Sequence, residues 1–186
     1  NGKVWYREAE AAFDKEYAAS IGMPVNRVDF GQRRFDTVED IFEDMEKKIT
    51  WAKENDAPGL YIIDSLDALS DREEQKRKID TGTYGGNKPK KMGELFRRLI
   101  RQLEESHICV IIISQVRDKI GVTFGQKKTR SGGRALNFYA SIILYLSHLG
   151  AVYRTYHKQK RAIGVLVKVK CTKNKITKPF RDCKFL

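Results

Sequence analysis

The stretch Leu60-Tyr61-Ile62-Ile63-Asp64 decides the fold, because it is a continuous apolar run that ends in an acid. Strands of a parallel sheet are covered on both faces, so they need no alternation of apolar and polar residues. The run Ile108-Cys109-Val110-Ile111-Ile112-Ile113 has the same character and ends at Ser114-Gln115. We therefore predict two fully buried parallel strands, over residues 60–63 and 108–113.

Helical periodicity flanks these strands. One predicted helix begins after Thr37, which can cap it with Asp40 three residues on, and ends near Asn55. Its apolar face consists of Val38, Ile41, Phe42, Met45, Ile49 and Ala52. A second helix precedes the second strand, with an apolar face made of Met92, Leu95, Phe96, Leu99, Ile100 and Leu103.

Shorter elements lie at both ends of the chain. Residues 4–6 read as a short strand, and Asp14 can cap a helix that runs to about Ile21. A short helix over 135–140 leads into a strand over 141–146, and Val165, Val167 and Val169 alternate as in a further strand. Two polar segments that contain glycine, residues 70–91 and 116–134, are predicted to be long loops.

The order strand, helix, strand, helix, strand predicts an α/β fold. We expect a mostly parallel twisted sheet flanked by helices, with antiparallel edge strands at the C-terminus. The chain has 186 residues, which suits a single domain over 1–186, and no linker divides it.

Charge points to a polyanionic partner. The chain carries a net charge of +12, but residues 1–70 are net −6 and residues 71–186 are net +18. Nucleic acid is the first candidate partner. An anionic membrane ranks below it, because no basic amphipathic helix with exposed aromatic residues is present.

Cysteine usage and hydropathy exclude other classes. The three cysteines are an odd number without a Cys-x-x-Cys pair, which argues against a disulfide framework or a zinc finger. No apolar run approaches the length of about 20 residues that spans a bilayer, and the first residues do not resemble a signal peptide. We expect a cytoplasmic protein.

Polar residues follow the predicted strands where an α/β sheet binds its ligand. Asp64 and Ser65 follow the first buried strand, Gln115 follows the second, and Glu8 and Glu10 follow the strand over 4–6. An acid at the end of an apolar strand is typical of a Walker B motif, which holds Mg²⁺ beside nucleotide phosphates. A turn-forming aspartate is the alternative for Asp64.

Five segments together resemble the bacterial RecA recombinase family, in its order and spacing. They are residues 8–14 (EAEAAFD), 60–69 (LYIIDSLDAL), 111–125 (IIISQVRDKIGVTFG), 131–141 (SGGRALNFYAS) and 173–180 (KNKITKPF). The resemblance covers essentially the whole chain, and hexameric helicases lack the stretch 111–141. It implies a RecA-like P-loop NTPase core that uses ATP and Mg²⁺.

The resemblance implies roles at the phosphates. Asp64 would coordinate the magnesium ion, helped by Ser65, and Glu10 would activate the attacking water. Gln115 would sense the γ-phosphate and couple it to the second loop. A strand-end amide with an ordinary hydrogen bond is the alternative for Gln115.

It also implies contacts to the base and between subunits. Tyr17 would stack on the adenine, and Asp14 would accept a hydrogen bond from its amino group. Lys173 and Lys175 would reach the phosphates held by a neighbouring subunit. A solvated strand face is the alternative for these two lysines.

The loops 70–91 and 116–134 would be the two DNA-binding loops. Cations bind phosphates, glycines admit the strand, and an exposed apolar side chain can wedge between bases. The candidate DNA-binding residues of the second loop are Arg117, Lys119, Ile120, Gly121, Phe124, Lys127, Lys128, Arg130, Gly132, Gly133 and Arg134. Charged loops without a ligand are the alternative.

The sequence departs from the family pattern in one major way. No Gly-x-x-x-x-Gly-Lys-[Ser/Thr] run is present, and the one Gly-Lys pair, Gly2-Lys3, precedes Val4. We therefore expect a partial chain that begins after the Walker A segment and that binds Mg-ATP weakly by itself. Smaller departures are Glu8 for Asp, Arg134 for Asn and Asn137 for Lys.

The resemblance implies an ATP-dependent DNA strand-exchange protein. The full-length protein would form a filament on single-stranded DNA, pair it with a homologous duplex and hydrolyse ATP in a DNA-dependent manner. A non-catalytic paralogue that acts as a recombination mediator is the alternative, and a hexameric helicase is disfavoured by the stretch 111–141.

Overall fold

The computed structural model describes residues 2–77, 87–118, 128–130 and 133–186. The sequence suggested one domain, and the chain forms two compact units, Asn1–Leu136 and Asn137–Leu186. We call these the N-terminal unit and the C-terminal unit. In the described ranges, no helix has the length and apolar character needed to cross a bilayer.

A four-stranded parallel sheet forms the centre of the N-terminal unit, in the order β2–β1–β3–β4. The strands are β1 (Lys3–Glu8), β2 (Val28–Asp29), β3 (Gly59–Asp64) and β4 (Ile108–Ile112). Glu8 pairs with Asp64 in the register of β1 and β3, so the carboxyl ends of these strands meet at one edge. The predicted α/β fold is confirmed.

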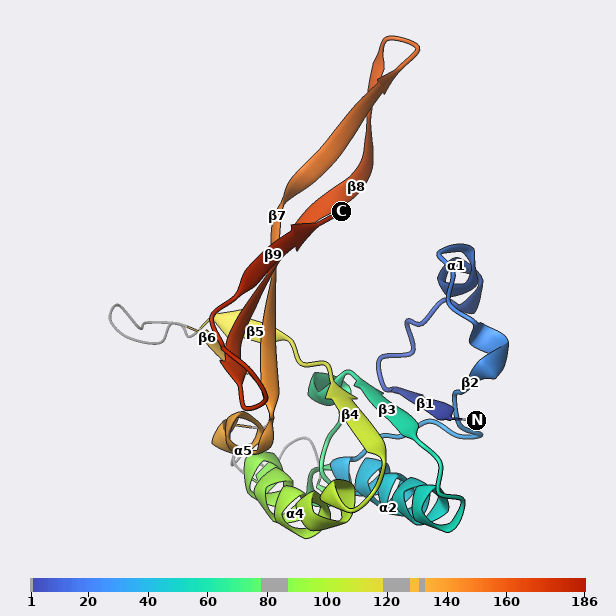
Figure 1. Cartoon of the computed structure of the whole chain (residues 1–186), viewed down its shortest axis with the longest axis vertical. Helices are drawn as coiled ribbons and strands as arrows, with labels where there is room; N and C mark the ends of the chain where they lie inside the picture. The colour runs from blue at the N-terminus through green and yellow to red at the C-terminus, as the bar shows by residue number, and fades with distance from the viewer. Residues whose placement is uncertain (1, 78–86, 119–127, 131–132) are drawn as a thin grey trace. The chain divides into compact units, whose positions relative to one another are not determined.

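Two helices cover one face of this sheet, α2 (Val38–Glu54) and α4 (Asn87–Glu104) (Figure 1). The predicted apolar face of α2 is buried throughout. The Thr37 hydroxyl accepts a hydrogen bond from the Asp40 backbone N–H and donates one to the Asp40 carboxylate, which confirms the predicted cap. Phe42 packs edge-to-face on Phe96, with ring centroids 5.4 Å apart. Ile100 departs from the predicted buried face of α4, because its side chain is exposed.

The prediction of fully buried strands holds for β3 only at Tyr61 and Ile63, because Leu60 and Ile62 are half-buried, and it is wrong for β4. Its burial alternates, and Cys109 and Ile111 are exposed. On the neighbouring strand, Tyr61 and Ile63 are fully buried, and the Tyr61 hydroxyl reaches α2 at Asp44. The described helices thus bury one face of the sheet, and the apolar residues of β4 that lie on the other face remain exposed.

Arg7 is a buried cation that the strand pattern did not predict. Its side chain is 1% exposed; Nε donates to Asp44 Oδ2 at 2.6 Å, and Nη1 donates to the Asp29 carbonyl at 2.7 Å. Burial alone would lower the pKa of Arg7, but the Asp44 carboxylate outweighs it and raises the pKa. This ion pair joins β1 to β2 and α2.

The two predicted loops are shorter than expected. Helix α3 (Arg72–Lys76), capped by Asp71, and the first turns of α4 lie within residues 70–91. Strands β5 (Val116–Asp118) and β6 (Lys128–Arg130) pair antiparallel within residues 116–134. Regular backbone hydrogen bonding therefore extends into both segments.

The C-terminal unit contains an antiparallel sheet in the order β7–β8–β9. The strands are β7 (Ile142–Tyr156), β8 (Gln159–Asn174) and β9 (Asp182–Phe185), and the helix α5 (Gly133–Tyr139) precedes them. The antiparallel C-terminal strands were expected, but they hydrogen-bond to one another as a separate sheet. β7 continues ten residues beyond the predicted end at Leu146.

Candidate functional site

The candidate site lies at the carboxyl ends of β1, β3 and β4, within the N-terminal unit. Parallel pairing brings Glu8, Asp64 and the segment after β4 to the same edge. The Ala9 backbone N–H donates to the Asp64 carbonyl at 2.7 Å, and the Leu66 N–H donates to the Ile113 carbonyl at 2.9 Å. These bonds fix the three chain segments that follow the strands.

Glu10 is the centre of this edge. Its Oε1 accepts a hydrogen bond from Ser65 Oγ at 2.5 Å and another from Gln115 Nε2 at 3.3 Å. Three residues that are separated by up to 105 positions in the sequence therefore meet at one carboxylate oxygen. Ser65 is buried, whereas Glu10 and Gln115 are exposed. The Glu10 carboxylate is therefore hydrogen-bonded to a buried hydroxyl on one side and open to solvent on the other.

Asp64 lies beside this cluster and is bonded to a residue that the sequence did not single out. The Tyr6 hydroxyl donates a hydrogen bond to Asp64 Oδ2. Burial and the carboxylates of Asp64 and Glu8 raise the pKa of Tyr6, so its phenol stays a donor at neutral pH. Tyr6 lies two residues before Glu8 on β1, and the parallel register could have placed it near Asp64.

Asp67 is a second residue that the sequence did not single out. Its Oδ2 accepts from the Gln115 backbone N–H at 2.6 Å. Asp67 belongs to the 3-10 turn Leu66–Ala68, which follows β3 directly. The turn therefore holds the backbone of Gln115 while the side chain of Gln115 reaches Glu10.

The two predicted adenine-binding residues lie at the start of α1 (Lys15–Ser20). Asp14 caps this helix, because its Oδ1 accepts from the backbone N–H groups of Glu16 and Tyr17, each at 2.9 Å. The predicted capping role is confirmed. The ring of Tyr17 is 65% exposed, so its face is accessible to a planar ligand.

A cavity of about 330 Å³ lies beside Glu8. Phe13 and Phe30 line it, with ring centroids 5.3 Å apart, and both rings contact the ring of Tyr6. Three cations also line the cavity: Lys15, Arg33 and Arg34. Arg33 and Arg34 are paired with Asp40 and Asp36, and Lys15 Nζ lies 4.6 Å from the centroid of the Phe30 ring.

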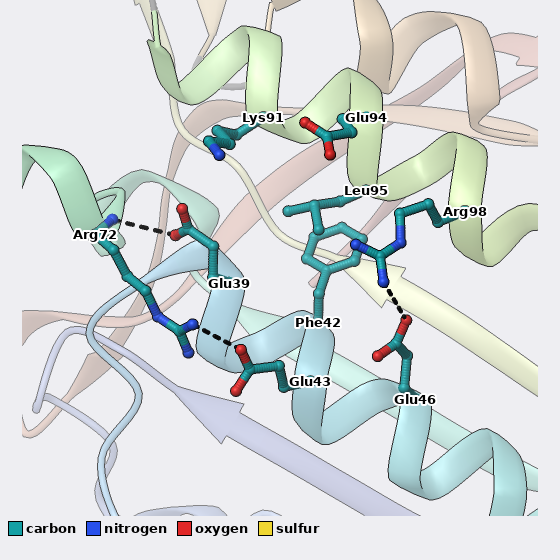
Figure 2. A pocket seen from close by; sticks show the side chains of 9 residues that line it. All are labelled: Glu39, Phe42, Glu43, Glu46, Arg72, Lys91, Glu94, Leu95 and Arg98. Atoms are coloured by element: carbon teal, nitrogen blue, oxygen red, sulfur yellow. Dashed lines mark hydrogen bonds and ion pairs between the residues drawn. The ribbon is translucent and has the colours of Figure 1, made fainter.

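A second cavity, of about 210 Å³, lies between α2, α3 and α4 (Figure 2). Two of its three cations are paired with its own acids: Arg72 Nη1 lies 2.7 Å from Glu43, and Arg98 Nη2 lies 3.7 Å from Glu46. None of the predicted site residues lines this cavity. These exposed pairs join α2 to α3 and α4.

Lys173 and Lys175 lie in the C-terminal unit. Lys173 Nζ donates to the carbonyls of Asn137 at 2.6 Å and Phe138 at 2.9 Å, and Lys175 Nζ lies 3.4 Å from the Phe138 carbonyl. Both ammonium groups therefore sit at the C-terminal end of α5, where cations are favoured. Desolvation and the neighbouring charge of Lys175 lower the pKa of Lys173.

The structure describes part of the predicted second DNA-binding loop. Arg117 lies on β5, Lys128 and Arg130 lie on β6, and Gly133 and Arg134 begin α5. The other predicted residues lie outside the described residues; they are Lys119, Ile120, Gly121, Phe124, Lys127 and Gly132.

Among the described residues, no group of three or more His, Cys, Asp or Glu side chains could hold a metal ion. Mg²⁺ typically takes only one or two protein carboxylates, together with waters and substrate phosphates. The donor set at this edge, the Asp64 carboxylate beside the Ser65 hydroxyl, has the oxygen chemistry that Mg²⁺ prefers.

Known proteins resemble this chain along its whole length. The family model for the RecA N-terminal domain matches residues 1–186. Protein RecA of Chlamydia muridarum is 35% identical over 184 residues, and Protein RecA of Chlamydia trachomatis serovar L2 is 34% identical over 184 residues. Each alignment covers 99% of this chain and 49% of the relative, so the chain spans about half the length of these relatives.

A solved structure of an ATPase domain from another protein has the same fold. It superimposes with a TM-score of 0.54 at 16% identity, over 98% of this chain and 70% of that chain. The predicted resemblance is confirmed by the match to the family model and by the identity to curated relatives. The chain belongs to the RecA family.

Proposed function

We propose that this chain is the core of an ATP-dependent DNA strand-exchange protein of homologous recombination. The complete protein would form a filament on single-stranded DNA in the cytoplasm, pair it with duplex DNA and hydrolyse ATP when DNA is bound. Membership of the RecA family supports this proposal. The observation that carries it is the convergence of Ser65 and Gln115 on Glu10.

Glu10 has the surroundings of a general base. A carboxylate that removes a proton from water must be oriented and accessible to that water. The Ser65 hydroxyl fixes one oxygen of Glu10 from the buried side, and the exposed side remains open to solvent. Bound magnesium would supply positive charge to the phosphates, and Asp64 is the residue placed to hold it.

Gln115 has the surroundings of a relay. Its side chain donates to Glu10, its backbone N–H is held by Asp67, and β5 begins at the next residue. A γ-phosphate that competes for the amide would weaken the bond of 3.3 Å to Glu10. The change in Gln115 would then pass directly into β5 and the segment between β5 and β6, which we propose as a DNA-binding loop.

The predicted roles of Tyr17, Lys173 and Lys175 are compatible with the geometry. Tyr17 has an exposed ring for stacking on adenine. The ammonium groups of Lys173 and Lys175 share the carbonyl of Phe138, so they form a compact pair of cations for a phosphate held by another subunit. The proposal therefore includes assembly of the protein into a homo-oligomer. It also includes binding of both single-stranded and double-stranded DNA.

The test is Glu10→Gln in the complete protein. We expect phosphate release stimulated by single-stranded DNA to fall by about 10²- to 10⁴-fold, the usual contribution of a general base. Binding of a fluorescent ATP analogue should remain, because the substitution keeps the shape of the side chain. Glu54→Gln, at an exposed position on α2, is the matched control.

Two results would contradict the proposal. An unchanged rate of ATP hydrolysis in Glu10→Gln would show that Glu10 is not the general base. A complete wild-type protein that binds DNA without hydrolysing ATP would instead indicate the non-catalytic mediator.

A further inference from the structure

The C-terminal unit contains a long stretch with cations and without acids. Residues 142–181 include ten Lys and Arg and no Asp or Glu. Four of these cations lie within eight residues around the turn between β7 and β8: Arg154, Lys158, Lys160 and Arg161. We call residues 153–161 the hairpin tip.

The hairpin tip is part of a regular ladder. Strands β7 and β8 stay paired up to Tyr156 and Gln159, which leaves a two-residue turn (Figure 1). The turn residues His157 and Lys158 have φ angles of 47° and 61°, as in the type I′ turns that match the twist of paired strands. The cations of the tip are therefore held at fixed spacing.

Like charges face each other across this ladder. Arg154 pairs directly with Arg161, an arrangement that destabilises an isolated hairpin. In the described part of the C-terminal unit, Asp182 pairs with Lys168, and no salt bridge involves Arg154 or Arg161. A polyanion bound at the tip would relieve this repulsion.

Exposed aromatic rings lie among the cations. Tyr153 and Tyr156 are 53% and 64% exposed, and Lys160 Nζ lies 4.5 Å from the centroid of the Tyr153 ring. Successive residues of a strand point to opposite faces. Arg154 and Arg161 therefore lie on one face of the ribbon, and Lys160 lies on the other.

We propose that the hairpin tip binds duplex DNA by entering its major groove. This groove admits a two-stranded β-ribbon, and phosphates line both of its walls. Cations on both faces of the ribbon suit two phosphate walls, whereas a membrane would meet a single cationic face. The tip uses none of the residues of the candidate loops or of the Glu10 cluster, and the proposal rests on the proposed function and deepens it by assigning a surface to the duplex.

The test measures binding of the 186-residue chain to a short labelled DNA duplex by fluorescence anisotropy, without nucleotide, across a range of salt concentrations. The variant is Arg154→Gln/Arg161→Gln. The control is Arg97→Gln/Arg101→Gln, which removes the same two side chains from exposed positions on α4. Thermal melts show whether each variant is folded, and loss of the Arg154–Arg161 repulsion should not weaken the hairpin.

The expected loss follows from counterion release. The logarithm of the binding constant changes by about 0.9 per phosphate contact for each tenfold change in salt. One phosphate contact therefore raises the binding constant about eightfold at about 0.1 M salt relative to 1 M, and two contacts raise it about sixtyfold. We expect the tip variant to bind duplex about 8- to 60-fold more weakly than wild type, with a salt slope shallower by about 1 to 2.

Three outcomes would overturn the proposal. One is a tip variant that matches the control in duplex affinity and salt slope. Another is an equal loss for single-stranded DNA of the same length, which would contradict groove entry. The third is a tip variant that loses more affinity for vesicles containing phosphatidylserine than for duplex DNA, which would assign the tip to a membrane. The assay needs no ATP, so its failure is distinguishable from failure of the proposed hydrolysis.

Discussion

The buried ion pair between Arg7 and Asp44 should be decisive for the stability of the N-terminal unit. Arg7→Met keeps the length and apolar character of the side chain but removes the charge. The substitution leaves Asp44 Oδ2 with the Tyr61 hydroxyl at 2.9 Å, while Lys48 lies 3.5 Å from Oδ1. It also leaves the Asp29 carbonyl without its donor at 2.7 Å.

The expected loss can be estimated from this geometry. Removing one partner of a buried pair typically costs about 3–5 kcal/mol, because the other charge stays buried. Lys48 compensates part of the charge on Asp44, so we expect the lower end of this range, about 3 kcal/mol. Such a loss is a large part of the about 5–15 kcal/mol that stabilises an ordinary domain.

The assay is urea denaturation followed by tryptophan fluorescence. Both tryptophans of the chain, Trp5 and Trp51, lie in the N-terminal unit, and their rings are 5.5 Å apart. The control is Lys53→Met, which removes an exposed pair of nearly equal length, 2.7 Å to Glu105. We expect the control to unfold like wild type, because exposed pairs contribute little. Equal midpoints for Arg7→Met and Lys53→Met would refute the reasoning.

Three further predictions use the same chain. Thr37→Ala removes the cap of α2 and should lower the unfolding free energy by about 1 kcal/mol in urea, whereas an unchanged midpoint would deny the cap a stabilising role. Burial raises the pKa of Asp40, but Arg72 and the Thr37 hydroxyl outweigh it and lower the pKa below the ordinary 3.8. The stabilisation from Asp40 should therefore be present at neutral pH and be lost as the pH falls through the ordinary value of 3.8 and below it. Asp40→Asn should flatten this decline, and an equally steep decline in the variant would contradict the prediction. Isothermal titration with Mg-ATP should show weak or no binding, because the 186 residues contain no phosphate-binding Gly-Lys-[Ser/Thr] loop, and tight binding would contradict this expectation.

The sequence predicted the helices whose bounds depend on neighbouring residues, through apolar periodicity and capping residues. The apolar face of α2, its Thr37 cap and the Asp14 cap of α1 follow from periodicity and capping chemistry. β3 followed from its apolar run. The burial of β4 did not, because an apolar run does not reveal which face of a sheet its neighbours cover.

Long-range partners were harder to predict. Glu10, Ser65 and Gln115 were grouped through the family resemblance, and the structure joins them by hydrogen bonds. Tyr6 and Asp67 complete the cluster, but their contributions depend on the strand register and on a turn that no short motif specifies. The length of β7 also escaped prediction, because its exposed outer half is stabilised by pairing with β8.

The most direct test of the central claim is the nucleotide dependence of single-stranded DNA binding in the complete protein. Affinity is measured with a non-hydrolysable ATP analogue and with ADP, for wild type, Gln115→Ala and the control Gln102→Ala, whose amide bonds within its own helix. We expect wild type and the control to bind about 5- to 150-fold more tightly with the ATP analogue, a usual range for coupled sites. Gln115→Ala should lose this difference, and a variant that keeps it in full would contradict the account.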